Sequence, residues 1–325
     1  MGSLINGEWI KTPRPIDPQG RFRRAETQYR NWITADGRSG FKAEADRYHL
    51  YVSWACPWAH RTLLLRKLKG LEHAIGLSVV DHYMSDEGWE FTDRPGTIPD
   101  TVNHTRYVRE IYVKSRPDYT GRASVPVLWD KQRNVIVNNE SREIVRMLDL
   151  EFDGIARRDV TFCPEHLREQ IDRTIEALYE PINNGVYKSG FAKSQAAYEE
   201  AVTALFQALD RWEAVLERQR YLCGDVVTEA DWCLFTTLVR FDLVYHGHFK
   251  CNLRRLADYP MLWNYLKELC QLPGVAETCN LEHMKAHYYG SHPTVNPTGI
   301  VPLGPAQYAE QLAAPHDRAT RRYSS

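Results

Sequence analysis

The sequence contains no apolar run close to the roughly 20 residues that a membrane-spanning helix requires, so we expect no membrane segment. The first residues lack the basic start and apolar centre of a secretory signal peptide, which favours a cytoplasmic location. The formal net charge is only −1, and lysine and arginine are dispersed, so nucleic-acid binding is disfavoured. No glycine-rich phosphate loop is present either. These absences leave a cytosolic protein that binds neither membrane nor nucleic acid.

The chain also lacks any C-x-x-C pair among its seven cysteines. An odd number of cysteines without a secretion signal indicates thiols kept reduced in the cytosol rather than a disulfide framework. The segment 246–251, His-Gly-His-Phe-Lys-Cys, lacks the second ligand pair of a common zinc site, so we expect no metal. Five cysteines are expected to act as small buried apolar residues, namely Cys163, Cys223, Cys233, Cys270 and Cys279.

Four successive segments differ in pattern. Residues 1–47 are polar with little periodicity and predict an extended N-terminal arm. Residues 48–152 alternate strand-like and helix-like stretches, which predicts an α/β domain with a short mixed sheet. Residues 164–290 carry long amphipathic stretches without strand signals and predict an all-helical domain. Residues 291–325 are rich in proline and glycine and predict an irregular tail with a frayed end.

The predicted elements follow from hydrophobic periodicity and turn signals. In the α/β domain, strands are expected at 48–52, 77–80, 125–129 and 135–137, and helices at 57–71, 106–113 and 139–150. In the helical domain, helices are expected near 165–180, 195–218, 228–246 and 259–272. Thr228 and Asp231 fit a capping box at the start of the third of these helices. Pro126 begins a strand, which makes the Val125–Pro126 bond a candidate for the cis form.

Cys56 lies in the turn between a predicted strand and a helix that begins at Pro57. Unpaired N–H groups and the helix dipole would surround its sulfur with positive charge, and His60 and Arg61 would add to it. This environment favours the reactive thiolate. Ala59 stands where a C-x-x-C protein has its resolving cysteine, so a mixed disulfide on Cys56 needs an external thiol, and glutathione is the abundant cytosolic one. We therefore predict that Cys56 is a nucleophile.

Two further features suit an extended peptide such as glutathione. Glu140 and Ser141 lie at the predicted start of a helix, where N–H groups favour a carboxylate and Glu140 would hold an ammonium group. Val125, before Pro126, would offer its backbone N–H and C=O for strand-like pairing. Together these residues match the γ-glutamyl and cysteinyl parts of glutathione.

The stretches around Cys56, Val125 and Glu140 resemble those of the glutathionyl-hydroquinone reductases, also called Xi-class or omega-like glutathione transferases. The similarity covers about residues 20–305, and it rests on the segments 54–62, 88–89, 124–130, 138–141, 183–188, 238–242 and 296–299. The run Cys-Pro-Trp-Ala-His-Arg at 56–61 is its most specific part. One departure is Asp81-His82-Tyr83, where the family pattern has His-Pro.

The resemblance implies an α/β thioredoxin-like N-terminal domain, an all-α C-terminal glutathione-transferase domain and a homodimer. It implies glutathione-dependent reduction of glutathionyl-hydroquinones through a Cys56–glutathione mixed disulfide. By position, it implies glutathione-binding roles for Trp89, Arg109, Val125, Glu140 and Ser141, with Arg106 as the alternative to Arg109. It further implies catalytic roles for Tyr187 and Tyr288, which with Tyr245 would line the quinol site.

Three alternatives keep the same scaffold. A glutaredoxin-like thioltransferase or dehydroascorbate reductase of the omega type would use the same cysteine chemistry. A conjugating transferase is disfavoured, because a cysteine at this position forms mixed disulfides. A non-catalytic interaction module with the transferase fold is the remaining class, because fold does not fix function.

Overall fold

The computed structural model describes residues 2–323, which form two compact units. The first unit contains the described residues up to 14, together with 25–160 and 282–287. The second contains 15–24, 161–281 and the described residues from 288 onward. No helix within residues 2–323 is both long and apolar enough to cross a membrane.

The first unit is built on a four-stranded mixed sheet with the strand order β4-β3-β5-β6. Its strands are β3 (Tyr48–Val52), β4 (Ile75–Val79), β5 (Val127–Asp130) and β6 (Val135–Asn138). β3 pairs in parallel with β4 and antiparallel with β5, and β5 pairs antiparallel with β6. All five residues of β3 are buried, as expected for a central strand covered on both faces. The predicted short mixed sheet is confirmed.

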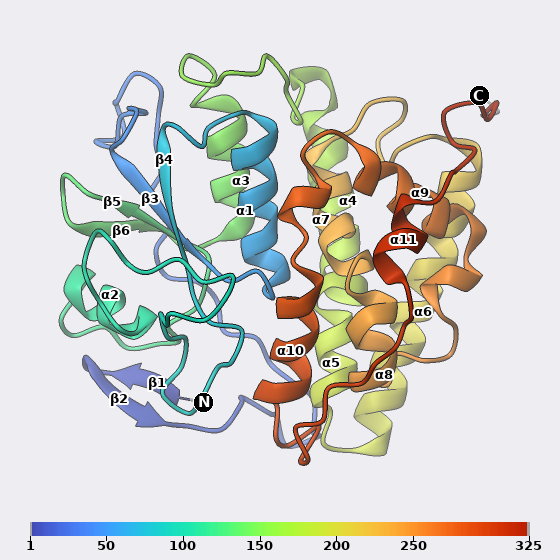
Figure 1. Ribbon diagram of the computed structural model, residues 1–325, viewed down its shortest axis with the longest axis horizontal. Coiled ribbons are helices and arrows are strands. Elements are labelled where there is room, and N and C mark those ends of the chain that lie inside the picture. Colours follow the sequence, from blue (N-terminus) through green and yellow to red (C-terminus); the bar gives the residue numbers. More distant parts are fainter. Residues whose placement is uncertain (1, 324–325) are drawn as a thin grey trace. The chain divides into compact units, whose positions relative to one another are not determined.

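Three helices accompany this sheet, α1 (Pro57–Leu68), α2 (Val108–Ser115) and α3 (Ser141–Leu150). α1 and α3 pack side by side next to the sheet, whereas α2 packs on β6 (Figure 1). Pro57 begins α1, where its missing N–H costs no hydrogen bond. Gly70 has a φ of +65° just after α1, a left-handed conformation that ends helices. This is why α1 ends before the predicted residue 71.

The predicted extended arm begins with a β-hairpin formed by β1 (Gly2–Ile5) and β2 (Glu8–Lys11). Its turn consists of Asn6 and Gly7, with φ values of 48° and 80°. Asn-Gly suits this turn because both central residues must adopt a left-handed conformation. The prediction of an arm without regular elements misses the hairpin because each strand has only four residues, too few for alternation to stand out.

The second unit is helical, which confirms the predicted all-α C-terminal domain. Its principal helices are α4 (Arg168–Leu178), α5 (Gly185–Phe191), α6 (Gln195–Arg218), α7 (Glu229–Leu238), α8 (His246–His248), α9 (Pro260–Gln271), α10 (Leu281–Ser291, shared with the first unit) and α11 (Tyr308–Ala313). α6 packs against α5 and α9, and α4 packs against α7 (Figure 1). The capping box of Thr228 and Asp231 is confirmed at the start of α7. The helix predicted over 228–246 is interrupted by a π-helical turn, Phe241–Tyr245.

The C-terminal tail is irregular over residues 292–307, as expected, but not beyond them, and the predicted frayed end lies outside the described residues. It contains α11, which packs on α9, and its Arg318 is 1% exposed. The Arg318 guanidinium donates to the Glu268 carboxylate of α9 at 3.0 Å. Buried side chains of residues 308–318 therefore make this part of the tail belong to the core of the second unit.

His49 in β3 gives the first unit a pH-dependent stability. Because Ser78 donates its hydroxyl proton to the Pro99 carbonyl at 2.8 Å, the His49 Nε2–H donates to Ser78 Oγ at 2.8 Å. Burial lowers the pKa of His49 from 6.5 to about 4. The unfolded chain therefore binds a proton more readily than the folded chain as pH falls from near 6.5 to about 4.

We expect this contribution of His49 to be complete above about pH 7 and to be lost on acidification, by about 2 kcal/mol at about pH 5. Urea unfolding of the wild type and of His49→Gln at about pH 7.5 and about pH 5 measures it. The variant keeps a donor for Ser78 but cannot titrate, so its loss of stability should be smaller. Equal losses in both proteins would show that His49 is not the source.

Candidate active site

Cys56 is the residue that immediately precedes α1, with extended backbone angles φ −77° and ψ 120°. Its carbonyl accepts the N–H of His60 at 2.9 Å, so the first turn of the helix begins at the cysteine. The side chain is partly buried, and its thiol donates to the Val125 carbonyl at 3.5 Å. Cys56 therefore lies at the N-terminal, positive end of the α1 dipole.

Val125 places its backbone beside the Cys56 sulfur, and its bond to Pro126 is cis, as the sequence indicates. Its carbonyl accepts the thiol proton, while its N–H has no acceptor among residues 2–323. An unpaired N–H beside an unpaired or weakly bonded carbonyl is the arrangement that binds an extended peptide by strand-like pairing.

The start of α3 provides a second group of polar atoms. Glu140 caps the helix, and its carboxylate accepts the Arg142 N–H and the Thr27 hydroxyl, each at 3.2 Å. Ser141 is the first helical residue, and within the described chain its N–H donates to no protein group. The buried Arg61 of α1 lies 3.5 Å from the Ser141 hydroxyl through Nη1. An N–H, a hydroxyl and a guanidinium thus meet at a helix N-terminus, which suits a carboxylate.

Trp89 lies in the loop between β4 and α2 and is 9% exposed. Its indole stacks on the ring of His287, with centroids 4.8 Å apart and planes at 25°. His287 is held in turn by its Nδ1–H, which donates to the His82 carbonyl at 2.7 Å. At the departure from the family pattern, the Asp81 carboxylate accepts the Tyr83 N–H and the Thr92 hydroxyl and so closes the loop that contains Trp89.

The two candidate arginines occupy different environments. Arg109 has a 17% exposed side chain, and its guanidinium forms an ion pair with Glu87 at 3.0 Å. It also lies over the rings of Tyr107 and Trp9, at 4.0 and 5.1 Å from their centroids. Arg106 is 70% exposed and pairs with Glu90 at 2.8 Å. Arg109 of α2 is therefore packed against the loop that carries Trp89, whereas the side chain of Arg106, which belongs to that loop, lies at the surface.

The three predicted tyrosines meet inside the second unit. The Tyr288 hydroxyl of α10 hydrogen-bonds to those of Tyr187 of α5 and Tyr245, the latter at 3.0 Å. Tyr288 is 1% exposed, and burial raises its pKa well above 10, with the neighbouring phenols adding to the shift. Tyr288 therefore remains a neutral hydroxyl that donates a hydrogen bond at physiological pH. Arg24 covers the Tyr187 ring at 4.9 Å.

Several supporting residues escape prediction from the sequence. Trp9 beside Arg109, His287 beside Trp89 and Arg24 beside Tyr187 each lie far along the chain from the residue they contact. No local pattern signals such partners. Within residues 2–323, no group of three or more histidine, cysteine, aspartate or glutamate side chains is arranged to hold a metal.

Comparisons with known proteins agree in sequence and in structure. Residues 55–151 match the family described as glutathione S-transferase, N-terminal domain, and residues 195–268 match the corresponding C-terminal domain. Glutathionyl-hydroquinone reductase YqjG of Escherichia coli is 49% identical over 99% of both chains. Glutathionyl-hydroquinone reductase PcpF of Sphingobium chlorophenolicum is 51% identical, over 94% of this chain and 97% of the relative.

Solved structures that are similar to this chain come from the same group of proteins. The Xi-class transferase from Natrialba magadii has a TM-score of 0.93 at 50% identity, covering 100% of this chain and 98% of the other. The glutathione-bound structure of YqjG has a TM-score of 0.90 at 47% identity, covering 98% and 100%.

Proposed function

The chain belongs to the glutathionyl-hydroquinone reductases of the Xi class of glutathione transferases, and we propose that it reduces glutathionyl-hydroquinones to hydroquinones and releases oxidised glutathione. The position of Cys56 at the start of α1, with alanine at residue 59, carries this proposal. A thiol in that position forms a mixed disulfide that only an external thiol resolves. The names of the relatives and the glutathione bound to one of them support glutathione as that thiol.

Glutathione would be held by groups of the first unit. The unpaired N–H of Val125 suits the cysteinyl part of the peptide, and the N–H and hydroxyl of Ser141 suit the α-carboxylate of its γ-glutamyl part. The Glu140 carboxylate would hold the ammonium group. We propose that Trp89 covers the bound peptide and that Arg109, rather than Arg106, contributes the positive charge, because the less exposed Arg109 guanidinium contacts Glu87 in the loop of Trp89.

The reaction would proceed in two steps. The Cys56 thiolate attacks the glutathione sulfur of the conjugate, the bond from sulfur to ring carbon breaks, and its electron pair stays on the ring. A ring in the keto form accepts that pair as an enolate, which takes up a proton to give the hydroquinone. A second glutathione thiolate then attacks the mixed disulfide, releases oxidised glutathione and restores Cys56.

Tyr187 and Tyr288 would support the first of these steps. A neutral phenol donates to the ring oxygen and stabilises the negative charge that develops there. The shared hydrogen bond between the two tyrosines fixes their hydroxyls, and Tyr245 would complete the quinol site. The raised pKa of Tyr288 supports this role, because it keeps the donated proton in place.

Replacing Tyr288 by phenylalanine should lower kcat for the glutathionyl-hydroquinone by about 10²- to 10³-fold. Adduct formation at Cys56 from oxidised glutathione should stay unchanged, since that reaction involves no ring. Tyr289→Phe is the matched control, because its half-buried hydroxyl lies one residue further along α10. Equal kcat values for the two variants would contradict the assigned role of Tyr288.

Two assays on the wild-type protein test the function itself. We expect turnover of glutathionyl-menadiol or glutathionyl-chlorohydroquinone with glutathione, and ping-pong kinetics. Strong conjugation of glutathione to chlorodinitrobenzene without reductase activity would replace the proposal with a conjugating transferase. Faster turnover of dehydroascorbate or of mixed disulfides than of any conjugate would favour the thioltransferase alternative. Absence of a glutathione adduct on Cys56 would favour the non-catalytic module.

We also propose a homodimer and a cytoplasmic location. A cytosolic location agrees with the use of glutathione, whose reduced form the cytosol maintains. Light scattering coupled to gel filtration should give about twice the chain mass of 37.7 kDa. A mass equal to that of one chain would contradict the dimer and leave the cysteine chemistry unaffected.

A further inference from the structure

Two cysteine thiols of the second unit face each other outside the proposed active site. Cys270 lies in the last turn of α9, and Cys279 follows the short 3₁₀ turn Ala276–Thr278. The Cys270 thiol is hydrogen-bonded with the Cys279 thiol. The Cys279 thiol also lies 3.7 Å from the Val275 carbonyl, within the loop that joins the two residues.

The backbone between the two cysteines is fixed by its own hydrogen bonds. Leu272 N–H donates to the Leu269 carbonyl at 3.2 Å, and Val275 N–H donates to the Leu272 carbonyl at 3.0 Å. Cys279 N–H donates to the Ala276 carbonyl at 3.0 Å. These bonds hold Cys279 folded back toward the end of α9, so the two sulfurs are already brought together in the folded chain.

The two thiols differ in access. Cys270 is 6% exposed, whereas Cys279 is only partly buried. The hydrogen bond with Cys279 and then burial raise the pKa of Cys270 well above its ordinary value. Cys279 is therefore the thiol that an external oxidant reaches first, and Cys270 is the buried thiol that reacts with it in the second step.

We propose that Cys270 and Cys279 form an intramolecular disulfide when the protein is exposed to a small disulfide such as oxidised glutathione. The Cys279 thiolate attacks one sulfur of oxidised glutathione, and the first glutathione leaves as a thiol. Cys270 then loses its proton and attacks the Cys279 sulfur, and the second glutathione leaves. Two protein thiols are oxidised, one molecule of oxidised glutathione is reduced to two of glutathione, and the two thiol protons pass to the products.

This modification is independent of Cys56, although the oxidant is the product that the proposed reaction releases. Other cysteines of the second unit are placed differently. The buried Cys223 thiol lies 3.7 Å from the Thr174 hydroxyl, and burial raises the pKa of Cys251 to about 12. Neither of these contacts involves a second thiol. The extent to which Cys223 and Cys251 are oxidised therefore shows whether oxidation is specific to the pair of Cys270 and Cys279.

The test uses the full-length Cys56→Ser protein, in which no adduct can form at the proposed nucleophile. It is incubated with oxidised glutathione, unfolded in N-ethylmaleimide and digested with trypsin. Both cysteines lie in one tryptic peptide, residues 268–285. We expect that peptide to carry two maleimides before oxidation, and none afterwards, with a mass two hydrogens lower than the reduced unlabelled peptide. Dithiothreitol should restore both labels.

Single variants separate the two steps. In Cys270→Ser the peptide should retain one glutathione on Cys279, because the resolving thiol is missing. In Cys279→Ser, the buried Cys270 should remain available for labelling after oxidation. Circular dichroism checks that both variants are folded, and substitution of the partly buried Cys279 is the milder of the two.

Three results would overturn the proposal. The first is retention of both maleimides on the peptide after oxidation. The second is a stable glutathione on Cys279 while Cys270 is still labelled, which would show that the pair cannot close. The third is oxidation of Cys223 to the same extent, which would reflect unfolding rather than a preformed pair. Since none of these results depends on quinol turnover, they leave the proposed function to its own assays.

Discussion

Replacing Cys56 by serine is expected to lower kcat/KM for glutathionyl-menadiol by roughly 10⁴-fold or more, the scale on which loss of a covalent nucleophile acts in other enzymes. A serine hydroxyl cannot form the mixed disulfide, so both half-reactions are blocked at the same atom. The position before α1 and the contact with the Val125 carbonyl remain available to serine, so the fold should be unaffected. Steady-state kinetics with the purified variant measure the loss.

Cys223→Ser is the matched control for this result. Cys223 is a buried thiol of the second unit with no role in the proposed chemistry, so the substitution should leave kcat close to the wild-type value. Intact mass after incubation with oxidised glutathione provides a second readout, since only the protein with Cys56 should gain glutathione at that residue. A Cys56→Ser protein that keeps most of its activity would require another nucleophile. A wild type that gains glutathione at Cys56 but reduces no conjugate would retain the thiol chemistry and lose the substrate class.

The parts of the site that sequence predicts are those set by neighbouring residues. Cys56 before Pro57, Val125 before Pro126, and Glu140 before Ser141 each combine a local backbone preference with one reactive or polar group. A strand followed by a cysteine and a helix-initiating proline determines the helix-terminal position of the sulfur without knowledge of the rest of the chain. β3 is predicted with its correct ends for a similar reason, because its aromatic residues, its leucine and its β-branched valine form a buried run.

The parts that sequence does not predict depend on distant contacts or on weak helical preference. His287 meets Trp89 only because α10 contributes residues 282–287 to the first unit. α5 contains Gly185 and Gly190, which disfavour a helix, yet a side chain at Gly190 would lie 2.1 Å from the Phe249 ring. Close packing against that ring thus requires glycine and overrides helical preference. The hairpin at the N-terminus is a different case. Its turn signal, Asn6-Gly7, is present in the sequence, but its strands are too short for their alternating pattern to be recognised.

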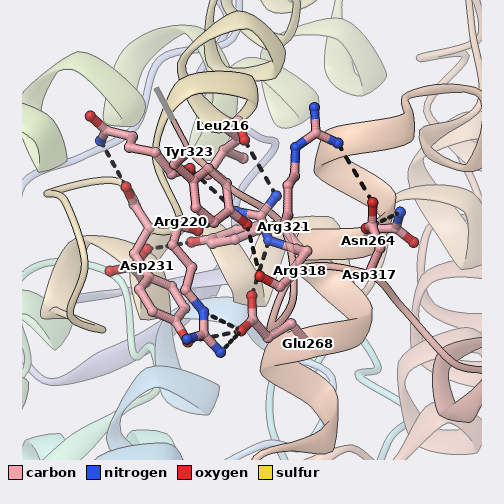
Figure 2. A network of polar contacts seen from close by, with 12 residues as sticks. Leu216, Arg220, Asp231, Asn264, Glu268, Asp317, Arg318, Arg321 and Tyr323 are labelled. Atoms are coloured by element: carbon pink, nitrogen blue, oxygen red, sulfur yellow. Dashed lines mark hydrogen bonds and ion pairs between the residues drawn. The ribbon is translucent and has the colours of Figure 1, made fainter. Parts of the chain in front are cut away.

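The C-terminal tail illustrates how a buried charge can fix a segment that composition predicts to be irregular. Figure 2 shows Glu268 between two arginines, with Arg318 of the tail on one carboxylate oxygen and Arg220 on the other. The Tyr221 hydroxyl also donates to this carboxylate, at 3.0 Å. Arg318 further donates to the backbone carbonyls of Leu216 and Arg220, at the end of α6 and just beyond it. The network joins the tail, α9 and the end of α6.

Glu268→Ala or Arg318→Ala is therefore expected to lower the free energy of unfolding by roughly 3–5 kcal/mol, the cost of leaving one member of a buried ion pair uncompensated. Removing Glu268 leaves two guanidinium groups facing each other, while removing Arg318 leaves its carbonyl partners without their donor. Urea unfolding followed by circular dichroism measures the change, and the near-ultraviolet signal reports the packing of the second unit. The loss should appear at every protein concentration, because the network lies within one chain.

Arg321→Ala is the control from the same tail. Arg321 pairs with Asp317 at 3.6 Å at the surface of the unit, and an exposed pair of this kind contributes about 0–1 kcal/mol. The two arginines are three residues apart and differ mainly in burial, so their difference isolates the buried pair from the general effect of losing a positive charge. If Arg318→Ala and Arg321→Ala unfold at the same urea concentration, the tail adds no stability through Glu268. If only Arg318→Ala is destabilised, the tail contributes to the free energy of unfolding of the helical domain through this buried ion pair.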